Sequence, residues 1–227
     1  MNKNRNFLAV IVIGPPGSGK GTQIKLLAEK FRFFHFISSR VGRDYIFSHN
    51  DPPAMRQKER YEKGLLFDKE WMFERVKEKT EEIFNHQNEF NGIIYDGSPR
   101  TLYEAEMLYD FLIDSLGKEN LKIIEIDVRD EELKKRIEKR LICNQSGEHV
   151  FIESDELKPC VKCPECHGVL QERDIDKKEI FDVRMKEYKN QTVPALNFLA
   201  TKQKIIKING EQSIENVHGD ILKLLNL

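Results

Sequence analysis

The sequence predicts an α/β fold in which a parallel sheet is covered by helices on both faces. Short apolar runs alternate with amphipathic segments along the chain, a pattern typical of parallel strands joined by helical crossovers. A glycine-rich stretch follows the first apolar run directly and precedes a helical pattern. We expect strands at the apolar runs of residues 7–13, 90–96, 121–128 and 204–210, and a further buried segment at residues 33–37.

The glycine-rich stretch, residues 14–22, reads Gly-Pro-Pro-Gly-Ser-Gly-Lys-Gly-Thr, and its place between strand and helix is typical of a phosphate-binding loop. Glycines let backbone N–H groups point at a polyphosphate, and the helix N-terminus adds a partial positive charge. Lys20 supplies a full charge, although Gly21 stands where such loops usually have Ser or Thr. A turn without a ligand is the weaker alternative. We predict a phosphate-loop NTPase fold with a nucleotide site at Gly17, Ser18, Gly19, Lys20, Gly21 and Thr22, which the resemblance described below implies to be the ATP site.

The run at residues 90–96 ends in Asp96, and a turn follows it. In a phosphate-loop fold, an aspartate at the carboxyl tip of a neighbouring strand can hold magnesium through water. Strand ends are often acidic by chance, so the inference depends on the loop at residues 14–22. We expect Thr22 and Asp96 to bind magnesium, directly or through water.

The remaining segments predict helices of different lengths. Residues 38–67 form a charged section that Asp51-Pro52-Pro53 breaks into two or three short helices. The segment that begins at Asp130 predicts a helix with Arg136 and Arg140 on one face, where a solvated surface is the simpler interpretation. Longer amphipathic patterns predict helices at residues 69–84, 102–116, from 178 onward and 213–225.

Composition excludes several classes of protein. The chain of 227 residues has 37 basic and 38 acidic side chains, and a net charge of −1 argues against a broad nucleic-acid surface. Apolar runs fall short of the roughly 20 residues that a membrane span needs, and the N-terminus has no signal-peptide pattern. We expect a cytoplasmic, monomeric enzyme that binds neither nucleic acid nor membrane.

All four cysteines lie close together in a segment with little helical or strand periodicity, residues 141–176. Such clustering suits a metal site in a reducing compartment better than a disulfide framework. Zinc prefers thiolate or imidazole ligands in a closed tetrahedron, so Cys143, Cys160, Cys163 and Cys166 are the expected ligands. His149 and His167 are reserves, and a metal-free segment held by polar contacts is the alternative. The acidic composition of this segment argues against a nucleic-acid-binding zinc ribbon.

These motifs resemble those of the adenylate kinases, within the nucleoside monophosphate kinases, over essentially the whole chain. Gly-Lys-Gly-Thr-Gln at residues 19–23 is that family's form of the phosphate loop, which accounts for Gly21. Asp-Gly-Ser-Pro-Arg-Thr at residues 96–101 is similar to the family's Asp-Gly-Phe-Pro-Arg-Thr signature, with Ser98 in place of phenylalanine. The spacing from Cys143 to Cys163 is that of zinc-bearing lids in the family, although Ser146 stands at one ligand position.

The resemblance implies site residues beyond the phosphate loop. Arg136 and Arg140 match arginines that flank the donor base and phosphates. Asp176 retains one member of an acidic pair whose other member is Ile175 here. The acceptor AMP is expected at Ser38, Arg43, Phe67, Gly97, Arg100 and Glu104. The transferring phosphoryl group is expected to be stabilised by Lys20, Arg100, Arg140, Arg173 and Arg184.

The resemblance also implies a division of the chain and a mechanism. A core would comprise residues 1–37, 68–140 and 177–227, with a monophosphate-binding insertion at 38–67 and a lid at 141–176. Phosphoryl transfer depends on positioning and on stabilising negative charge, so no general base is sought. The implied reaction is the reversible, magnesium-dependent conversion of ATP and AMP to two ADP, in nucleotide homeostasis.

Glu104 departs from the family, which has Gln at this position. A Gln amide matches the acceptor N1 and the amino donor N6 of adenine, whereas an ionised Glu only accepts and suits the two donors of guanine. AMP remains the expected acceptor, and GMP is the alternative. A phosphate-loop NTPase switch and a kinase for another small molecule are further alternatives, which a panel of nucleoside monophosphates would separate.

Overall fold

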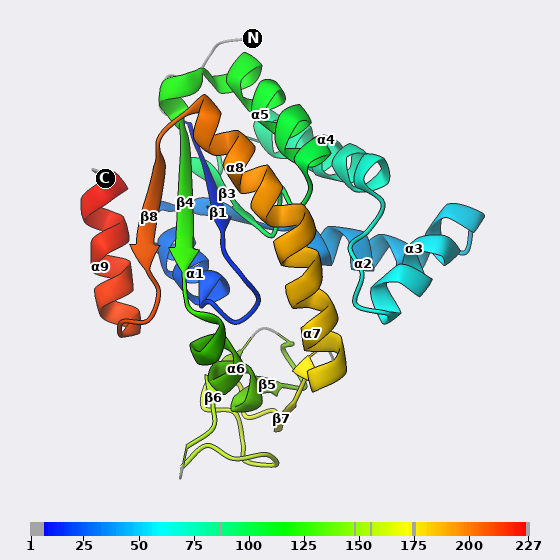
Figure 1. Ribbon diagram of the computed structural model, residues 1–227, viewed down its shortest axis with the longest axis vertical. Coiled ribbons are helices and arrows are strands. Elements are labelled where there is room, and N and C mark those ends of the chain that lie inside the picture. Colours follow the sequence, from blue (N-terminus) through cyan, green and yellow to red (C-terminus); the bar gives the residue numbers. More distant parts are fainter. Residues whose placement is uncertain (1–6, 87, 148, 155, 174–175, 226–227) are drawn as a thin grey trace.

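A five-stranded parallel sheet forms the centre of the molecule in the computed structural model, which describes residues 7–86, 88–147, 149–154, 156–173 and 176–225. Its strand order is β2-β3-β1-β4-β8, and every neighbouring pair is parallel (Figure 1). This confirms the predicted α/β class. The strands are β1 (Leu8–Ile13), β2 (Phe33–Ile37), β3 (Gly92–Asp96), β4 (Leu121–Asp127) and β8 (Ile205–Asn209).

Helices cover both faces of this sheet, which explains why its strands are apolar without alternation. In β1, Ala9, Ile11 and Ile13 pack into the core beneath α4, α5 and α8. Val10 and Val12 point to the opposite core, beneath α1, α6 and α9. The helices concerned are α1 (Lys20–Phe31), α4 (Lys69–Asn85), α5 (Leu102–Leu116), α6 (Asp130–Glu138), α8 (Val193–Lys202) and α9 (Ile214–Leu225).

Two short helices follow β2 and project to one side of the sheet, as Figure 1 shows. They are α2 (Ser38–Ser48) and α3 (Pro52–Glu62), and they confirm the prediction of short helices in this section. Asp51 caps α3 by accepting a hydrogen bond from the backbone N–H of Ala54 at 2.9 Å. The proline that follows Asp51 fits the first turn, where its missing N–H costs nothing.

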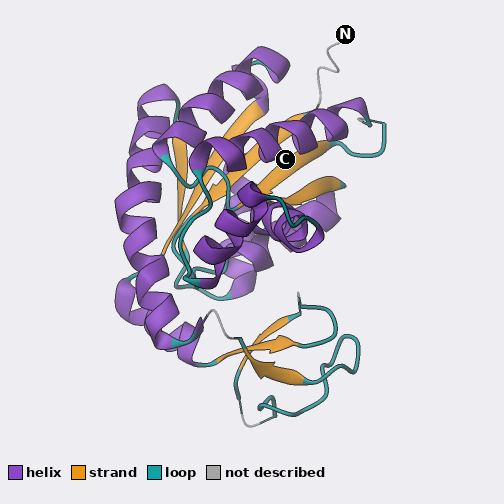
Figure 2. Cartoon of the chain, turned by 90° about the vertical axis from the view of Figure 1, so that its right-hand side faces the viewer, coloured by secondary structure: helices purple, strands orange, loops and turns teal. Residues whose placement is uncertain are grey.

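A small antiparallel sheet lies apart from the parallel one (Figure 2). It has the order β6-β5-β7 and consists of β5 (Arg140–Cys143), β6 (Val150–Ile152) and β7 (Leu170–Glu172). The expectation that one helix carries both Arg136 and Arg140 is therefore wrong, because α6 ends at Glu138 and Arg140 begins a strand. Strands of three or four residues are too short to produce a readable period of two.

The chain returns to the core through α7 (Lys178–Glu187), which a π-helical segment, η3 (Tyr188–Thr192), joins to α8. The helix predicted from residue 178 onward is thus α-helical as far as Glu187, and η3 begins at Tyr188. A 3₁₀ turn, η1 (Lys118–Asn120), connects α5 to β4. Among the described residues, no helix combines the length and the apolar character that a membrane crossing requires.

Candidate active site

The glycine-rich loop connects β1 to α1, and Lys20 is the first residue of that helix. Gly17 and Gly19 have φ values of +87° and +88°, in the left-handed region that side chains with a Cβ rarely adopt. The Lys20 ammonium donates hydrogen bonds to the carbonyl oxygens of Gly14 at 2.6 Å and Pro15 at 2.8 Å. The loop therefore curls around the lysine, while Gly21 and Thr22 face solvent at the start of the helix.

The environment of Lys20 is strongly cationic. Burial lowers the pKa of Lys20 to about 7, and Asp96 opposes that shift. The positive charges of Arg100, Arg184 and Arg140 lower the pKa further. Because like charges gather here without an equal number of carboxylates, the region attracts a polyanion.

Asp96 lies at the carboxyl end of β3, beside the start of α1. A Cβ placed on Gly21 would lie 3.7 Å from Oδ2 of Asp96, so the carboxylate is next to the segment that carries Thr22. The imidazole Nε2 of His35 lies 3.3 Å from the same oxygen. Burial alone would raise the pKa of Asp96, but the contact with His35 and the charge of Lys20 outweigh it and lower that pKa. A hydroxyl and an ionised carboxylate are oxygen donors that suit magnesium.

Three of the predicted arginines gather around one buried carboxylate. The side chain of Asp176 is 5% exposed and pairs with both Arg140 and Arg184. Arg140 Nε donates to Oδ2 at 2.6 Å, and Arg184 Nη1 donates to Oδ1 at 3.2 Å. Burial lowers the pKa of Arg184 to about 10, and Arg140 contributes to the shift. Burial also lowers the pKa of Arg173, with Arg140 as the next cause. Ile175 lies outside the described residues.

The structure thus brings together cationic groups that are far apart in sequence. Arg140 comes from β5, Arg184 from α7 and Arg100 from the loop after β3. Each of these acts on the pKa of Lys20, and Arg173 acts on that of Arg184. Arg43 of α2 also lies near enough to Arg173 to lower its pKa.

A small pocket lies between α2, the segment before α4 and the loop after β3. Its polar lining is Ser38, Ser39, Gly97, Arg100 and Glu104, and its apolar lining is Leu66, Phe67 and Met72. Five of the six expected acceptor residues therefore line one pocket. Arg43 is outside this lining and is half-exposed, 4.0 Å from Asp44.

Backbone contacts position the polar residues of this pocket. Ser38 donates from its hydroxyl to the carbonyl oxygens of Gly97 at 2.5 Å and Asp96 at 3.1 Å. Arg100 Nε donates to the carbonyl of Gly97 at 2.7 Å. Gly97 has a φ of +77°, and a Cβ there would lie 2.3 Å from an Arg100 guanidinium nitrogen, so glycine permits the arginine to fold over the turn.

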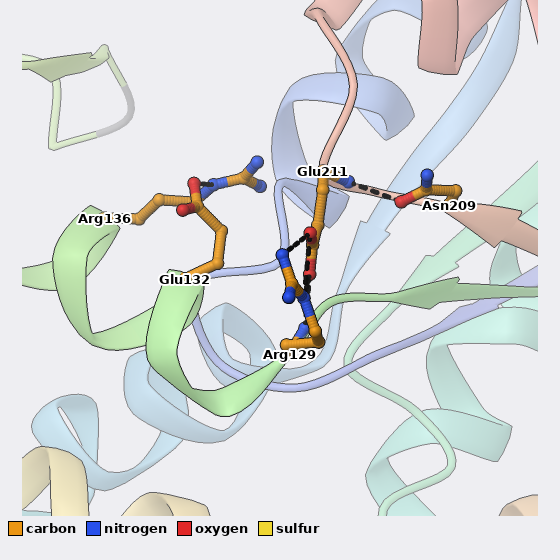
Figure 3. Close-up of polar contacts among 5 residues, drawn as sticks. All are labelled: Arg129, Glu132, Arg136, Asn209 and Glu211. Carbon is orange, nitrogen blue, oxygen red and sulfur yellow. Dashed lines mark hydrogen bonds and ion pairs between the residues drawn. The ribbon is translucent and has the colours of Figure 1, made fainter.

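Arg136 lies away from the cluster around Asp176. On α6, its Nε donates to Glu132 at 2.9 Å, one helical turn earlier (Figure 3). Nearby, Arg129 at the end of β4 pairs through two nitrogens with Glu211, which follows β8. The backbone N–H of Glu211 donates to Oδ1 of Asn209 at 3.0 Å. The contact with Arg129 lowers the pKa of the Glu211 carboxyl, and the charge of Arg136 contributes, so Arg136 lies near the β8–α9 connection. Sequence reasoning did not identify the Arg129–Glu211 pair.

The antiparallel sheet holds a compact group of possible metal ligands. One ligand atom from each of Cys143, His149, Cys163 and Cys166 lies within 4.8 Å of every other. The Sγ atoms of Cys143 and Cys166 are 3.4 Å apart, and Sγ of Cys163 is 3.4 Å from Nδ1 of His149. Tetrahedral zinc with Zn–S of about 2.3 Å and Zn–N of about 2.0 Å would separate its ligands by roughly 3.5–3.8 Å, so the group fits zinc.

Cys160, the expected fourth ligand, is not in this group. It is exposed, has a φ of +70°, and its backbone N–H donates to Leu170 instead. His149 provides the fourth possible ligand atom instead, although the sequence indicated it only as an alternative ligand. The other alternative, His167, is exposed and also outside the group. The hydroxyl Oγ of Ser146 accepts a hydrogen bond from the backbone N–H of His149 at 3.0 Å.

An ion pair links this group to the core. Glu165 Oε2 lies 3.2 Å from Nε2 of His149 and 3.1 Å from Nζ of Lys25 on α1. A carboxylate at Nε2 favours the imidazole form that keeps Nδ1 free to bind a metal. Sequence reasoning missed both Glu165 and Lys25, since neither belongs to a motif.

Comparisons with known proteins are consistent with this geometry. A family model described as adenylate kinase matches residues 12–204. An adenylate kinase of Petrotoga mobilis is 34% identical over 218 residues, which cover 96% of this chain and 97% of that protein. Adenylate kinases of Chlamydia felis and Methanothrix thermoacetophila are 35% and 33% identical, and the matches cover 93% and 96% of this chain and 94% and 98% of those proteins.

Proposed function

Since this chain belongs to the adenylate kinase family, we propose that the site described above transfers the terminal phosphoryl group of magnesium-bound ATP to AMP, reversibly, to give two ADP. The observation that supports this assignment best is the convergence of Lys20, Arg100, Arg140 and Arg184 on the phosphate loop. Two nucleotides bring several anionic phosphates together, and such a cationic cluster offsets their mutual repulsion.

The donor phosphates bind at the loop between β1 and α1. The backbone N–H groups at the start of α1 face the phosphates, and the Lys20 ammonium leaves its present acceptors, Gly14 and Pro15, to contact them. Thr22 and Asp96 hold magnesium, directly or through water. The ion would supply positive charge that offsets the negative charge of the donor phosphates. Arg136 contributes to the donor side from α6.

The acceptor binds in the pocket between α2 and the loop after β3. Its phosphate is held by Arg100 and Arg43, with Ser38 and Gly97 beneath it, while the base lies against Phe67 and Glu104. A planar guanidinium contacts a phosphate through two parallel N–H groups, which lysine cannot reproduce. Arg100 therefore fixes the acceptor phosphate and also stabilises the transferring group.

Arginines of the lid and its flanks complete the charge stabilisation. In phosphoryl transfer the transition state spreads negative charge over the moving oxygens, and Arg140, Arg173 and Arg184 offset it. Movement of residues 141–176 over the donor and of residues 38–67 over the acceptor excludes water, which would otherwise accept the phosphoryl group. No side chain acts as a general base in this scheme.

The lid binds a structural zinc ion through Cys143, His149, Cys163 and Cys166. Their donor atoms fit a closed tetrahedron, a coordination that leaves zinc no open position for a substrate. The metal then stabilises a small sheet whose own apolar core is limited to a few residues, among them Leu141 and Leu170. The division into core, insertion and lid remains a prediction, as do the monomeric state, the cytoplasmic location and the lack of nucleic-acid or membrane partners.

A panel of nucleoside monophosphates tests the proposal. The purified protein is given Mg-ATP with AMP, GMP, CMP or UMP, and nucleoside diphosphates are quantified. We expect ADP formation that depends on AMP, with GMP much poorer. Hydrolysis of ATP at a rate that no monophosphate changes would contradict the assignment and favour a phosphate-loop NTPase.

A further inference from the structure

The acceptor pocket contains a buried carboxyl group that phosphoryl transfer itself does not require. Glu104, in the first turn of α5, lines the pocket and is only 3% exposed. Its Oε2 accepts a hydrogen bond from the backbone N–H of Arg100 at 3.1 Å. The other contacts of the carboxyl group are long: 3.3 Å to the hydroxyl of Thr101 and 3.5 Å to that of Ser98.

These contacts only partly satisfy an ionised carboxylate, which has room for about four donors. The charged group that faces it is Arg100, from the loop before α5. The pocket lining contributed by α2, by the segment before α4 and by α4 is uncharged: Ser38, Ser39, Leu66, Phe67 and Met72. Burial raises the pKa of Glu104, and Arg100 opposes this shift without cancelling it.

We propose that Glu104 determines the acceptor base by binding adenine as a neutral carboxylic acid, whose hydroxyl donates to N1 while its carbonyl oxygen accepts from the N6 amino group. This inference rests on the proposed function, in which AMP occupies the pocket. A neutral acid carries one donor and one acceptor side by side, and the adenine edge presents the complementary pair. An ionised carboxylate would instead place a lone pair against N1, which leaves both groups unsatisfied.

Binding of AMP also changes the charge balance around Glu104. In the proposed acceptor site, Arg100 contacts the AMP phosphate, and a dianion compensates the positive charge that opposes protonation of Glu104. The proton is therefore held more tightly once AMP is bound. It follows that the protein takes up a proton with AMP when the pH lies above the pKa of Glu104 in the AMP-free protein and below its pKa in the complex.

A purely local role for Glu104 is the competing explanation. Thr101 caps α5 by accepting from the backbone N–H of Glu104 at 3.2 Å, and the Glu104 carboxyl reaches back to the N–H of Arg100. Such a reciprocal arrangement stabilises a helix N-terminus without any ligand. A Gln side chain keeps an acceptor for the Arg100 N–H, so Glu104→Gln retains this capping contact and removes only the ionisation.

The test is calorimetric binding of AMP without ATP, from about pH 6.5 to about pH 9, in two buffers of different ionisation enthalpy. Wild type, Glu104→Gln and Glu106→Gln are compared; Glu106 is exposed on the same helix and controls for the change in charge. At the upper end of this range we expect wild type and Glu106→Gln to take up about one proton more per AMP than Glu104→Gln does. The ratio of wild-type to Glu104→Gln Kd should rise with pH, approaching about tenfold per unit. Ionisation of the AMP phosphate and of Lys20 is common to all three proteins and cancels in the ratio.

A pH-independent Kd ratio, with proton uptake that is equal in wild type and Glu104→Gln, would overturn the inference and leave the proposed function intact. Wild type that prefers GMP to AMP at high pH, with the preference reversed in Glu104→Gln, would also overturn it, because the ionised carboxylate would then be recognising guanine. Lack of AMP binding in all three proteins at every pH would contradict the proposed function itself.

Discussion

Arg140 donates two hydrogen bonds to Asp176, and its Nε lies 2.6 Å from Oδ2 of that carboxylate. Arg140 begins the antiparallel sheet, whereas Asp176 lies two residues before α7, so the pair joins the two ends of the segment proposed as the lid. Arg184 binds the same carboxylate from α7. Asp176 therefore holds two of the arginines that the proposed mechanism directs at phosphate.

Asp176→Asn should destabilise the nucleotide-free protein. Removal of one partner from a buried ion pair leaves uncompensated charge, and because the arginines keep some solvent contact we expect a loss of about 3 kcal/mol. For a chain of this size, that corresponds to a fall in Tm of roughly 6–12 °C in thermal unfolding. Asp182→Asn, on an exposed position of α7, is the matched control and should change Tm little.

ATP should restore part of this loss, because its phosphates offset the same arginine charges. The increase in Tm on adding saturating Mg-ATP should thus be larger for Asp176→Asn than for wild type. An equal increase in both proteins would show that nucleotide phosphates and Asp176 do not compete for these arginines.

The strands and helices of the core could be predicted because their patterns are long. Residues 102–116 were predicted as a helix and form α5 over those same residues, with Thr101 capping one end and Gly117 following the other. The antiparallel sheet could not be predicted in this way. Its three strands have three or four residues each, and their pairing depends on contacts between residues far apart, such as Leu141 with Glu172.

The fourth possible metal ligand also could not be predicted from the sequence. Spacing along the chain favoured Cys160, three residues before Cys163, but the turn there directs the backbone of Cys160 toward Leu170. His149 reaches the group because β5 and β6 form a hairpin that brings it back to Cys143, whose backbone N–H donates to the His149 carbonyl at 2.9 Å. Such proximity depends on the hairpin register, which the sequence does not reveal.

The zinc proposal predicts about one zinc ion per chain in protein prepared without added metal. Cys160→Ser should retain the metal, whereas His149→Ala should lose most of it and have a lower Tm. Elemental analysis and thermal unfolding measure both effects. Retention by His149→Ala together with loss by Cys160→Ser would restore Cys160 as the fourth ligand, and four freely titratable thiols in metal-free native protein would eliminate the site.

Lys20→Met should reduce phosphoryl transfer by roughly 10²–10³-fold, because it removes a charge that contacts the transferring phosphates. Far-UV circular dichroism and Tm should show a folded protein, since the methionine stem fills most of the same space. Lys25→Met, on an exposed turn of α1, is the matched control and should keep activity within a few fold. Comparable losses in both variants would mean that Lys20 has no special role.

The depressed pKa of Lys20 predicts that ATP binding depends on pH. In the nucleotide-free protein that pKa is about 7, against an ordinary value of 10.5, so above about pH 7 the lysine is largely neutral until phosphates restore its charge. ATP binding near pH 8 should therefore take up a proton, and the Kd for ATP should rise with pH above about 7. In the unliganded protein, the same shift lowers the folding stability as the pH falls from 10.5 to about 7.

Calorimetry of ATP binding in two buffers measures this proton uptake. Lys20→Met should bind ATP more weakly and without the Lys20-dependent proton, so the difference between wild type and variant isolates the residue. Identical proton uptake in both proteins would assign the proton to another group and contradict a neutral Lys20 in the empty site.

The central claim is that this chain interconverts ATP, AMP and ADP, and the most direct test supplies ADP and magnesium as the only substrates. The product of a kinase that uses AMP is ADP at both sites, so the reverse reaction needs no other nucleotide. We predict that ATP and AMP appear in equal amounts until equilibrium is reached, and that Lys20→Met slows their formation by roughly 10²–10³-fold. Persistence of ADP, or its conversion to AMP and free phosphate without ATP, would contradict the account.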